Sequence, residues 1–81
     1  MKEELHRLSC YVENRPGVLA RIVGLISGRG YNIQTLNVGP TEDGIVSRMK
    51  IDVLGSERVV QQIILQLRNQ VNVIEVTSRR L

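Results

Sequence analysis

The chain has 81 residues, of which 42% are hydrophobic and 2% aromatic, and its formal net charge is +3. A chain of this length is expected to form one small domain over residues 1–81, with a core that hides only about 60% of the unfolded surface. No apolar run approaches the roughly 20 residues that cross a bilayer, and the charged N-terminus does not resemble a signal peptide. The single Cys10 excludes a disulfide framework. We therefore expect a cytoplasmic protein with no membrane partner.

The positive charge is dispersed along the chain. Lysines and arginines stand singly among acidic residues, and only Arg79 and Arg80 are adjacent. A nucleic-acid-binding protein usually gathers its basic residues into a patch. The pattern is typical of a solvated surface, and we expect no nucleic-acid partner.

The first strand is predicted over residues 5–12, where apolar and polar residues alternate with a period of two. His6 belongs to this segment and is expected near the surface. The face expected to be buried carries Leu8, Cys10 and Val12.

A helix is predicted from Pro16 to about Gly28. Pro16 suits the first helical position, because a residue there needs no N–H bond. The segment Gly28–Gly30 is expected to end the helix in a left-handed conformation. Gly24 is expected where the helix backbone packs closely on the sheet, since glycine costs stability inside a helix. The apolar stripe of this helix consists of Val18, Leu19, Ile22, Val23 and Ile26.

A hairpin is predicted next. Residues 31–39 form a strand whose alternation slips between Ile33 and Leu36, which indicates a bulge or a bend. Residues 40–44 have the composition of a turn, and residues 45–54 alternate cleanly again. The core face of this strand is expected to carry Ile45, Met49, Ile51 and Val53, opposite Arg48, Lys50 and Asp52.

A second helix begins after Gly55, with Ser56 as its predicted N-cap and Glu57 placed against the positive end of the helix dipole. A last strand is predicted over residues 71–78. The apolar stripe of the second helix consists of Val59, Val60, Ile63, Ile64 and Leu67.

The predicted order is βαββαβ. Right-handed crossovers and a central hairpin arrange such a chain as a ferredoxin-like α+β sandwich, a four-stranded antiparallel sheet with both helices on one face. The other face of the sheet then has no cover within the chain. Water, a ligand or a partner must meet that face.

Other functions of this fold need residues that the sequence lacks. RNA binding requires aromatic residues on the central strands, and residues 45–54 contain none. A metal carrier requires a cysteine pair in the loop over residues 13–17, which contains no cysteine. An acylphosphatase-like hydrolase is suggested by Asn14 and Arg15, but no general base accompanies them. We expect no catalytic residue and no metal site.

The loop Asn14–Leu19 is the candidate binding site. It presents free backbone N–H groups at the positive end of a helix, beside Gly17, which allows a ligand to approach the backbone. This arrangement suits a carboxylate, and the Asn14 side chain adds both a donor and an acceptor. A helix cap with a conformational glycine explains the same residues equally well on geometry alone.

Asn32 and Ile33 begin the second strand, and they reach the loop only if a bend or a second copy of the chain brings them there. An amino acid held by its carboxylate at the helix would then place its ammonium group near Asn32. Its aliphatic side chain would contact Val18, Leu19 and Ile33. This arrangement is a hypothesis about a small-molecule amino-acid effector.

The sequence closely resembles the ACT domains of acetolactate synthase small subunits over nearly the whole chain. The segments that carry the resemblance are Glu13–Ile22, Arg29–Ile33, Leu36–Thr41, Ser47–Met49, Gln66–Arg68 and Val71–Val76.

The resemblance implies a non-catalytic regulatory subunit that binds the large, thiamine-diphosphate-dependent catalytic subunit and in many members responds to valine. The cofactors belong to the large subunit, so none is expected here. The resemblance also implies a homodimer or higher oligomer, with the effector between two domains. By this resemblance one copy contributes the loop residues Asn14, Gly17, Val18 and Leu19. The other copy contributes Asn32 and Ile33.

The alternative is a free-standing ACT-type module that binds an amino acid or a protein and regulates another enzyme. Longer members of the family continue into a C-terminal domain, whereas this sequence stops at Leu81, directly after the last predicted strand. It is either a natural short form or a fragment, and both remain open at the level of sequence.

Overall fold

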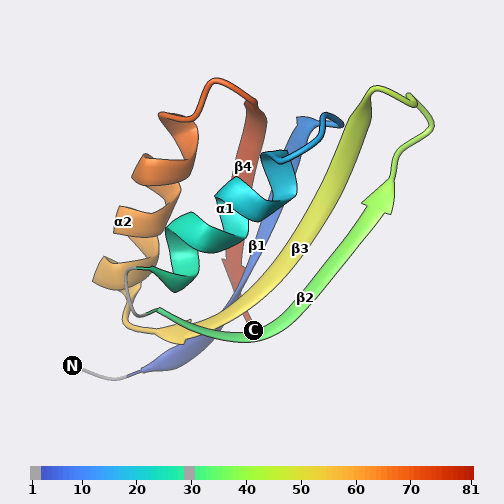
Figure 1. The fold of residues 1–81 in the computed structure, drawn as a ribbon. Coiled ribbons are helices and arrows are strands. Elements are labelled where there is room, and N and C mark those ends of the chain that lie inside the picture. Colours follow the sequence, from blue (N-terminus) through green and yellow to red (C-terminus); the bar gives the residue numbers. More distant parts are fainter. Residues whose placement is uncertain (1–2, 29–30) are drawn as a thin grey trace.

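A computed structural model describes residues 3–28 and 31–81 and shows the predicted order of elements (Figure 1). The elements are β1 (Glu4–Glu13), α1 (Val18–Ser27), β2 (Asn32–Pro40), β3 (Val46–Gly55), α2 (Glu57–Arg68) and β4 (Val73–Arg80).

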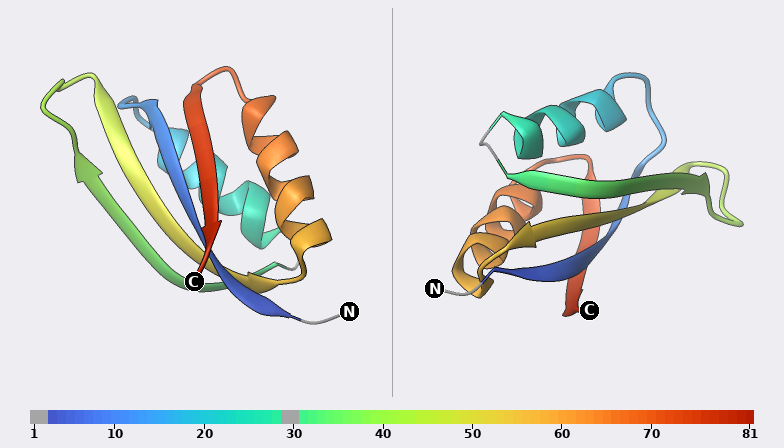
Figure 2. Two further views of the ribbon diagram at one scale, coloured as in Figure 1. Left: turned by 180° about the vertical axis from the view of Figure 1, so that it is seen from behind. Right: turned by 90° about the horizontal axis from the view of Figure 1, so that it is seen from below.

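The four strands form one sheet in the order β2-β3-β1-β4, and every neighbouring pair is antiparallel. The central strands are therefore β1 and β3, and the edges are β2 and β4. Both helices lie on the same side of the sheet (Figures 1 and 2). The predicted ferredoxin-like fold is confirmed.

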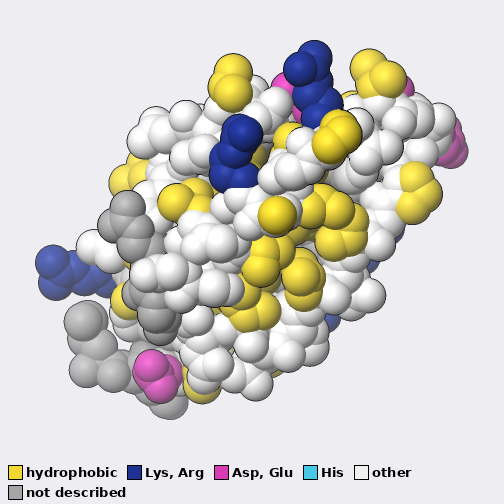
Figure 3. Space-filling view, in the orientation of Figure 1, with side chains coloured by type: hydrophobic (Ala, Val, Ile, Leu, Met, Phe, Trp, Pro, Cys, Tyr) yellow, Lys and Arg dark blue, Asp and Glu magenta, His cyan; other side chains and the backbone are white. Residues whose placement is uncertain are grey.

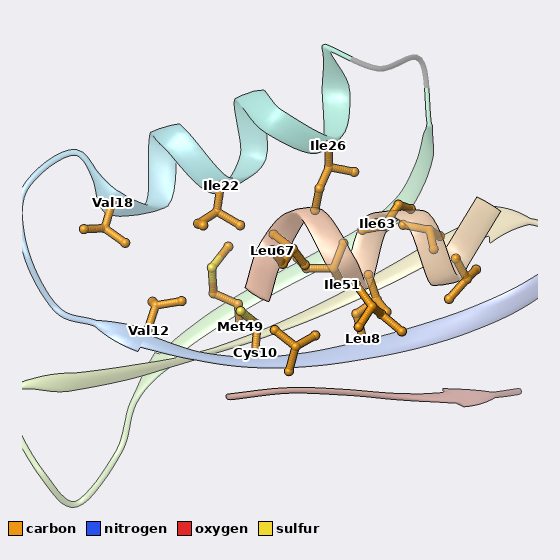
Figure 4. Close-up of a cluster of buried hydrophobic side chains, with 14 residues drawn as sticks. Leu8, Cys10, Val12, Val18, Ile22, Ile26, Met49, Ile51, Ile63 and Leu67 are labelled. Carbon is orange, nitrogen blue, oxygen red and sulfur yellow. The ribbon is translucent and has the colours of Figure 1, made fainter. Parts of the chain in front are cut away.

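The core lies between the helices and the central strands, because β1 and β3 turn alternate residues toward α1 and α2. Figure 4 shows these side chains facing one another across the two layers. The predicted strand faces and helix stripes supply nearly all of the core. Its buried residues are Leu8, Cys10, Val12, Val18, Ile22, Ile26, Met49, Ile51, Val53, Val60, Ile63, Ile64, Leu67 and Val76.

The ends of α1 differ from the prediction. Helix α1 begins at Val18, because Gly17 adopts a left-handed conformation with φ of 83° that interrupts the helix. Pro16 therefore lies in the preceding turn, and its prediction as the first helical residue is wrong. Gly28 has φ of −66°, so it does not provide the left-handed stop. Arg29 and Gly30 lie outside the described residues.

The predicted bulge in β2 is confirmed, because the pairing with β3 shifts between Ile33 and Thr35. Ile45 does not enter the core: it precedes β3 and is 73% exposed. The last strand begins at Val73, whereas Val71 is 88% exposed in the turn before it. A second irregularity interrupts the pairing of β4 with β1 beside Val12.

Two polar predictions have opposite outcomes. Ser56 is the N-cap of α2, and its Oγ accepts a hydrogen bond from the Val59 N–H at 3.3 Å. His6 is not near the surface: it is 2% exposed on the core side of β1. Its Nε2 has no hydrogen-bond partner among the described residues.

The helix-free side of the sheet, here called the open face, is polar in its middle and carries Leu5, Leu54 and Val46 toward the strand ends. Its residues alternate with the core residues of the same strands and lie opposite one another across the sheet. The polar middle consists of Arg7, Ser9, Tyr11, Thr35, Asn37, Gly39, Arg48, Lys50, Asp52, Glu75, Thr77 and Arg79.

Gly24 does not pack against the sheet, contrary to prediction. It is exposed on α1, and a Cβ at this position would meet no atom within 4 Å. Gly24→Ala is therefore expected to raise the free energy of unfolding by about 0.5–1 kcal/mol, because alanine loses less conformational entropy in a helix. Urea denaturation measures the change. Gly28→Ala is the contrasting variant, since its Cβ would lie 2.8 Å from the Gly24 carbonyl oxygen and should destabilise the chain. A loss of stability in Gly24→Ala would contradict the expectation.

Candidate functional site

The loop between β1 and α1 is tied to the β2–β3 turn. The Asn14 N–H donates to the Ile45 carbonyl at 2.8 Å, and the Asn14 side-chain amide donates to the Gly44 carbonyl at 3.3 Å. Asn14 is exposed, and its side-chain oxygen is not used in either bond. The loop is therefore held in place while one acceptor stays available for a ligand.

The first turn of α1 is uncapped. Gly17 supplies no side chain, and a Cβ there would meet nothing within 4 Å. Within the described part of the chain, the N–H groups of Leu19 and Ala20 meet no backbone acceptor, whereas the Val18 N–H donates to the Arg15 carbonyl at 3.2 Å. Unpaired N–H groups and the helix dipole make such a start favourable for an anion.

The two apolar residues of this loop have different environments. The Val18 side chain is 3% exposed and packs in the core, so only its backbone lies at the site. Leu19 is 37% exposed and can contact a ligand. Of the predicted apolar contacts from this loop, Leu19 alone presents an accessible side chain.

Asn32 and Ile33 lie at the opposite end of α1 from the loop (Figure 1). The ten-residue helix between them spans about 15 Å. Asn32 is exposed, and Ile33 is partly buried against the core. A single chain does not bring the two halves of the predicted site together.

Edge strand β2 carries apolar residues that the core does not cover. Leu36 is 41% and Val38 43% exposed, although they lie opposite the buried Ile51 and Met49. Figure 3 shows hydrophobic side chains gathered on the helix-bearing side of the molecule, next to α1. Sequence alternation predicts which face these residues occupy but not that β2 is an edge.

Two of the hollows in the described part of the surface adjoin the candidate loop and the open face. One, of about 620 Å³, adjoins the candidate loop, and the other, of about 360 Å³, lies on the open face. The first is lined by Glu13, Asn14, Arg15, Ile45, Val46, Val71 and Ile74. The second is lined by Arg7, Thr35, Asn37, Val38, Gly39, Arg48, Lys50 and Asp52.

Asp52 organises the hollow on the open face. Its two carboxylate oxygens accept bonds from Arg7 Nε at 2.8 Å and Arg7 Nη2 at 3.0 Å, and Thr35 Oγ1 donates to it at 2.8 Å. The hydrogen bonds from the Arg7 guanidinium hold the pKa of Asp52 below its usual range. Alternation in the sequence places Arg7 and Asp52 each opposite the core residues of its strand, but it does not predict their contact, because the contact depends on the register of β1 with β3.

Other chemistry is limited in the described residues. Burial raises the pKa of the Cys10 thiol to about 11, which keeps it protonated and unreactive at neutral pH. No group of three or more potential metal ligands of the His, Cys, Asp or Glu type occurs within residues 3–28 and 31–81. In the same ranges, no helix has the length and apolar character to cross a membrane.

The chain matches the family described as AHAS small subunit-like ACT domain over residues 8–75. It is 49% identical over 73 residues to a probable acetolactate synthase small subunit of Archaeoglobus fulgidus, covering 90% of this chain and 46% of that protein. It is 49% identical over 71 residues to the acetolactate synthase isozyme 3 small subunit of Escherichia coli, covering 88% and 44%. The chain thus spans less than half the length of these relatives.

Solved structures agree with these matches. The acetolactate synthase small subunit of Thermotoga maritima superimposes with a TM-score of 0.84 at 36% identity, covering 96% of this chain and 47% of that one. The ACT domain of GTP pyrophosphokinase from Chlorobium tepidum has a TM-score of 0.82 at 19% identity, covering 96% of this chain and 100% of that one. The second likeness shows the fold alone.

Replacing Asp52 tests the electrostatics of the open face. The lowered pKa means that the carboxylate stabilises the fold above its unfolded pKa of about 3.9, and that this stabilisation is lost as pH falls through the folded pKa. Asp52→Asn should therefore lower the free energy of unfolding at pH 7, and the difference from the unmodified chain should shrink below about pH 4. Urea unfolding at a series of pH values measures this. Glu75→Gln, on the same face, is the control and should change little; equal effects of both variants would contradict the assignment.

Proposed function

The chain belongs to the AHAS small subunit-like ACT domain family, and on that basis we propose that residues 1–81 form a single regulatory ACT domain of an acetolactate synthase. It binds the thiamine-diphosphate-dependent large subunit in the cytoplasm and changes its rate without catalytic chemistry of its own. Relatives named as small subunits support this role.

The proposed effector is valine or a related amino acid. Its carboxylate binds at the uncapped start of α1, against the N–H groups of Leu19 and Ala20. Its ammonium group meets the side chain of Asn32 and nearby carbonyls, and its aliphatic side chain lies between Leu19 and Ile33. The exposed, left-handed Gly17 supports this assignment, because a side chain at that position would project into the space before the helix.

A homodimer formed through β2 accounts for the separation of the two halves. The outer edge of β2 is unpaired within the sheet, and Leu36 and Val38 leave apolar surface beside it. Pairing two copies along this edge extends the sheet and covers that surface. The elongated sheet would have all four helices on one side.

In the proposed dimer, the direction of β2 would bring the two halves of the site close together. Asn14 is bonded to the turn that follows Pro40, so the loop lies at the C-terminal end of β2. In an antiparallel pair centred near Leu36, Asn32 of one copy lies beside Pro40 of the other. This is the observation that carries the proposal: the halves are at opposite ends of β2, and a two-fold axis exchanges those ends.

Gly17→Asp tests the effector site. Titration calorimetry with valine, leucine and isoleucine should detect binding of at least one by the unmodified chain, and Gly17→Asp should weaken it about 100-fold or more through repulsion of the carboxylate. Gly17→Asn is the matched control, because asparagine and aspartate have similar size and both tolerate a left-handed backbone. It separates the effect of charge from the effect of bulk. Binding unchanged by Gly17→Asp would refute the site.

Mixing two defective variants extends this test to the interface. Gly17→Asp and Asn32→Ala chains should each bind weakly alone, but a mixed dimer contains one site built from the intact loop and the intact strand. Recovery of binding after mixing is expected. An effector site within one chain, such as the hollow beside Arg15, Ile45 and Val71, would give no recovery.

Addition of the chain to a purified large subunit tests the regulatory role. Binding of valine without a change in the rate of the large subunit would favour the free-standing module.

Leu36→Asp should disrupt the dimer. A charged side chain on the apolar part of β2 loses the buried contact and is costly to cover, so dimer affinity should fall at least about tenfold. Sedimentation velocity over a range of concentrations measures the change. Leu65→Asp is the control, because Leu65 is 60% exposed on α2, away from β2. Equal dissociation of both variants, or of neither, would contradict pairing through β2.

A further inference from the structure

The open face is ordered in three rows that cross all four strands. The first row is Thr35–Asp52–Arg7–Arg79, the second is Asn37–Lys50–Ser9–Thr77, and the third is Gly39–Arg48–Tyr11–Glu75. Large aliphatic side chains are absent from these rows. The left view of Figure 2 shows this side of the sheet, which no helix covers. The middle of the open face therefore consists of hydrogen-bonding and charged groups on a sheet.

The charges of this face are unevenly compensated. Asp52 is only 5% exposed although no helix covers it, because the Arg7 guanidinium and the Thr35 hydroxyl enclose its carboxylate. The carboxylate of Asp52 is thus paired with Arg7 and holds the Arg7 side chain against the sheet. Arg48, Lys50 and Arg79 form no salt bridge among the described residues.

The rows carry four cationic and two anionic groups, so their net charge is positive. Arg48 and Lys50 alternate on one strand and flank the hollow of about 360 Å³. Side chains two positions apart on one face of a strand lie about 7 Å apart. Two free cations at this spacing, beside the amide of Asn37, can each pair with a separate carboxylate on a facing protein surface. A single small ligand in a closed cavity would fit this arrangement less well.

Two other occupants fit this face less well, one because of its charge and the other because of its few aromatic residues. A second copy of the chain would bring the same positive face against itself, and like charges in contact are unfavourable. A single-stranded nucleic acid would need aromatic side chains to stack its bases, and Tyr11 is the one aromatic residue of the rows. An acidic protein surface remains as the occupant that fits.

We propose that the open face, through Arg48, Lys50 and Arg79, docks against an acidic surface of the large catalytic subunit, an inference that rests on the proposed function for its partner. Four strands and three rows cover about 400 Å², whereas a stable protein interface takes about 800 Å² from each partner. Pairing through β2 places two open faces side by side and provides that area.

The experiment measures binding of the chain to a purified acetolactate synthase large subunit, at several salt concentrations. Arg48→Glu/Lys50→Glu should weaken binding about tenfold or more and reduce its dependence on salt. The neutral pair Arg48→Gln/Lys50→Gln should lie between this variant and the unmodified chain. Neither residue forms an ion pair among the described residues, so the fold is retained; thermal unfolding and valine binding verify this.

Arg58→Glu/Arg68→Glu is the matched control, because it makes the same charge change on exposed residues of α2. Loss of binding in the sheet variant alone supports the inference. Equal binding by the sheet variant and the unmodified chain, or an equal loss in the control, overturns docking while leaving the proposed function intact. Failure of the unmodified chain to bind any large subunit overturns both. Loss of binding to a single-stranded oligonucleotide, with large-subunit binding unchanged, would assign the face to nucleic acid instead.

Discussion

The structure depends on the fact that its sheet is covered on one side only. Along β1 and β3, each residue that enters the core is followed by one that faces away from the helices, as Leu8 is followed by Ser9 and Met49 by Lys50. Two short helices suffice to close this core because each contributes a single apolar stripe. The uncovered side must then be stable in water, and the Arg7–Asp52 pair provides buried polar contacts there without any further layer.

The packing of α1 in this core also explains why the candidate site is incomplete within one chain. Helix α1 uses the Val18 side chain to seat its first turn in the core, so the backbone at that turn is rigid while its N–H groups point outward. Gly17 leaves the space in front of them empty, in contrast to α2, where Ser56 fills the corresponding place with its hydroxyl. A helix start that receives no cap from its own sequence is available for a carboxylate from elsewhere.

Sequence patterns predicted the element order, the core and the bulge near Ile33, because these follow from local periodicity. They did not predict contacts that depend on register, such as the carboxylate of Asp52 against Arg7. They also failed where backbone conformation decided the outcome: Gly17 takes up the left-handed angle that the prediction gave to the far end of the helix. The candidate loop was chosen from sequence, but its separation from Asn32 by a helix about 15 Å long follows only from the fold.

The two edges of the sheet are not equivalent. The pairing of strand β4 with β1 is irregular beside Val12, and its exposed end carries Arg79 and Arg80, features that disfavour the addition of another strand. Strand β2 is smoother toward its C-terminal half and carries aliphatic residues. In the proposed pairing, a chain with one apolar edge and one charged, irregular edge would form a closed pair instead of a continuous ribbon. Strand addition would then stop after one step, which would limit fibre formation by a small, valine- and isoleucine-rich protein.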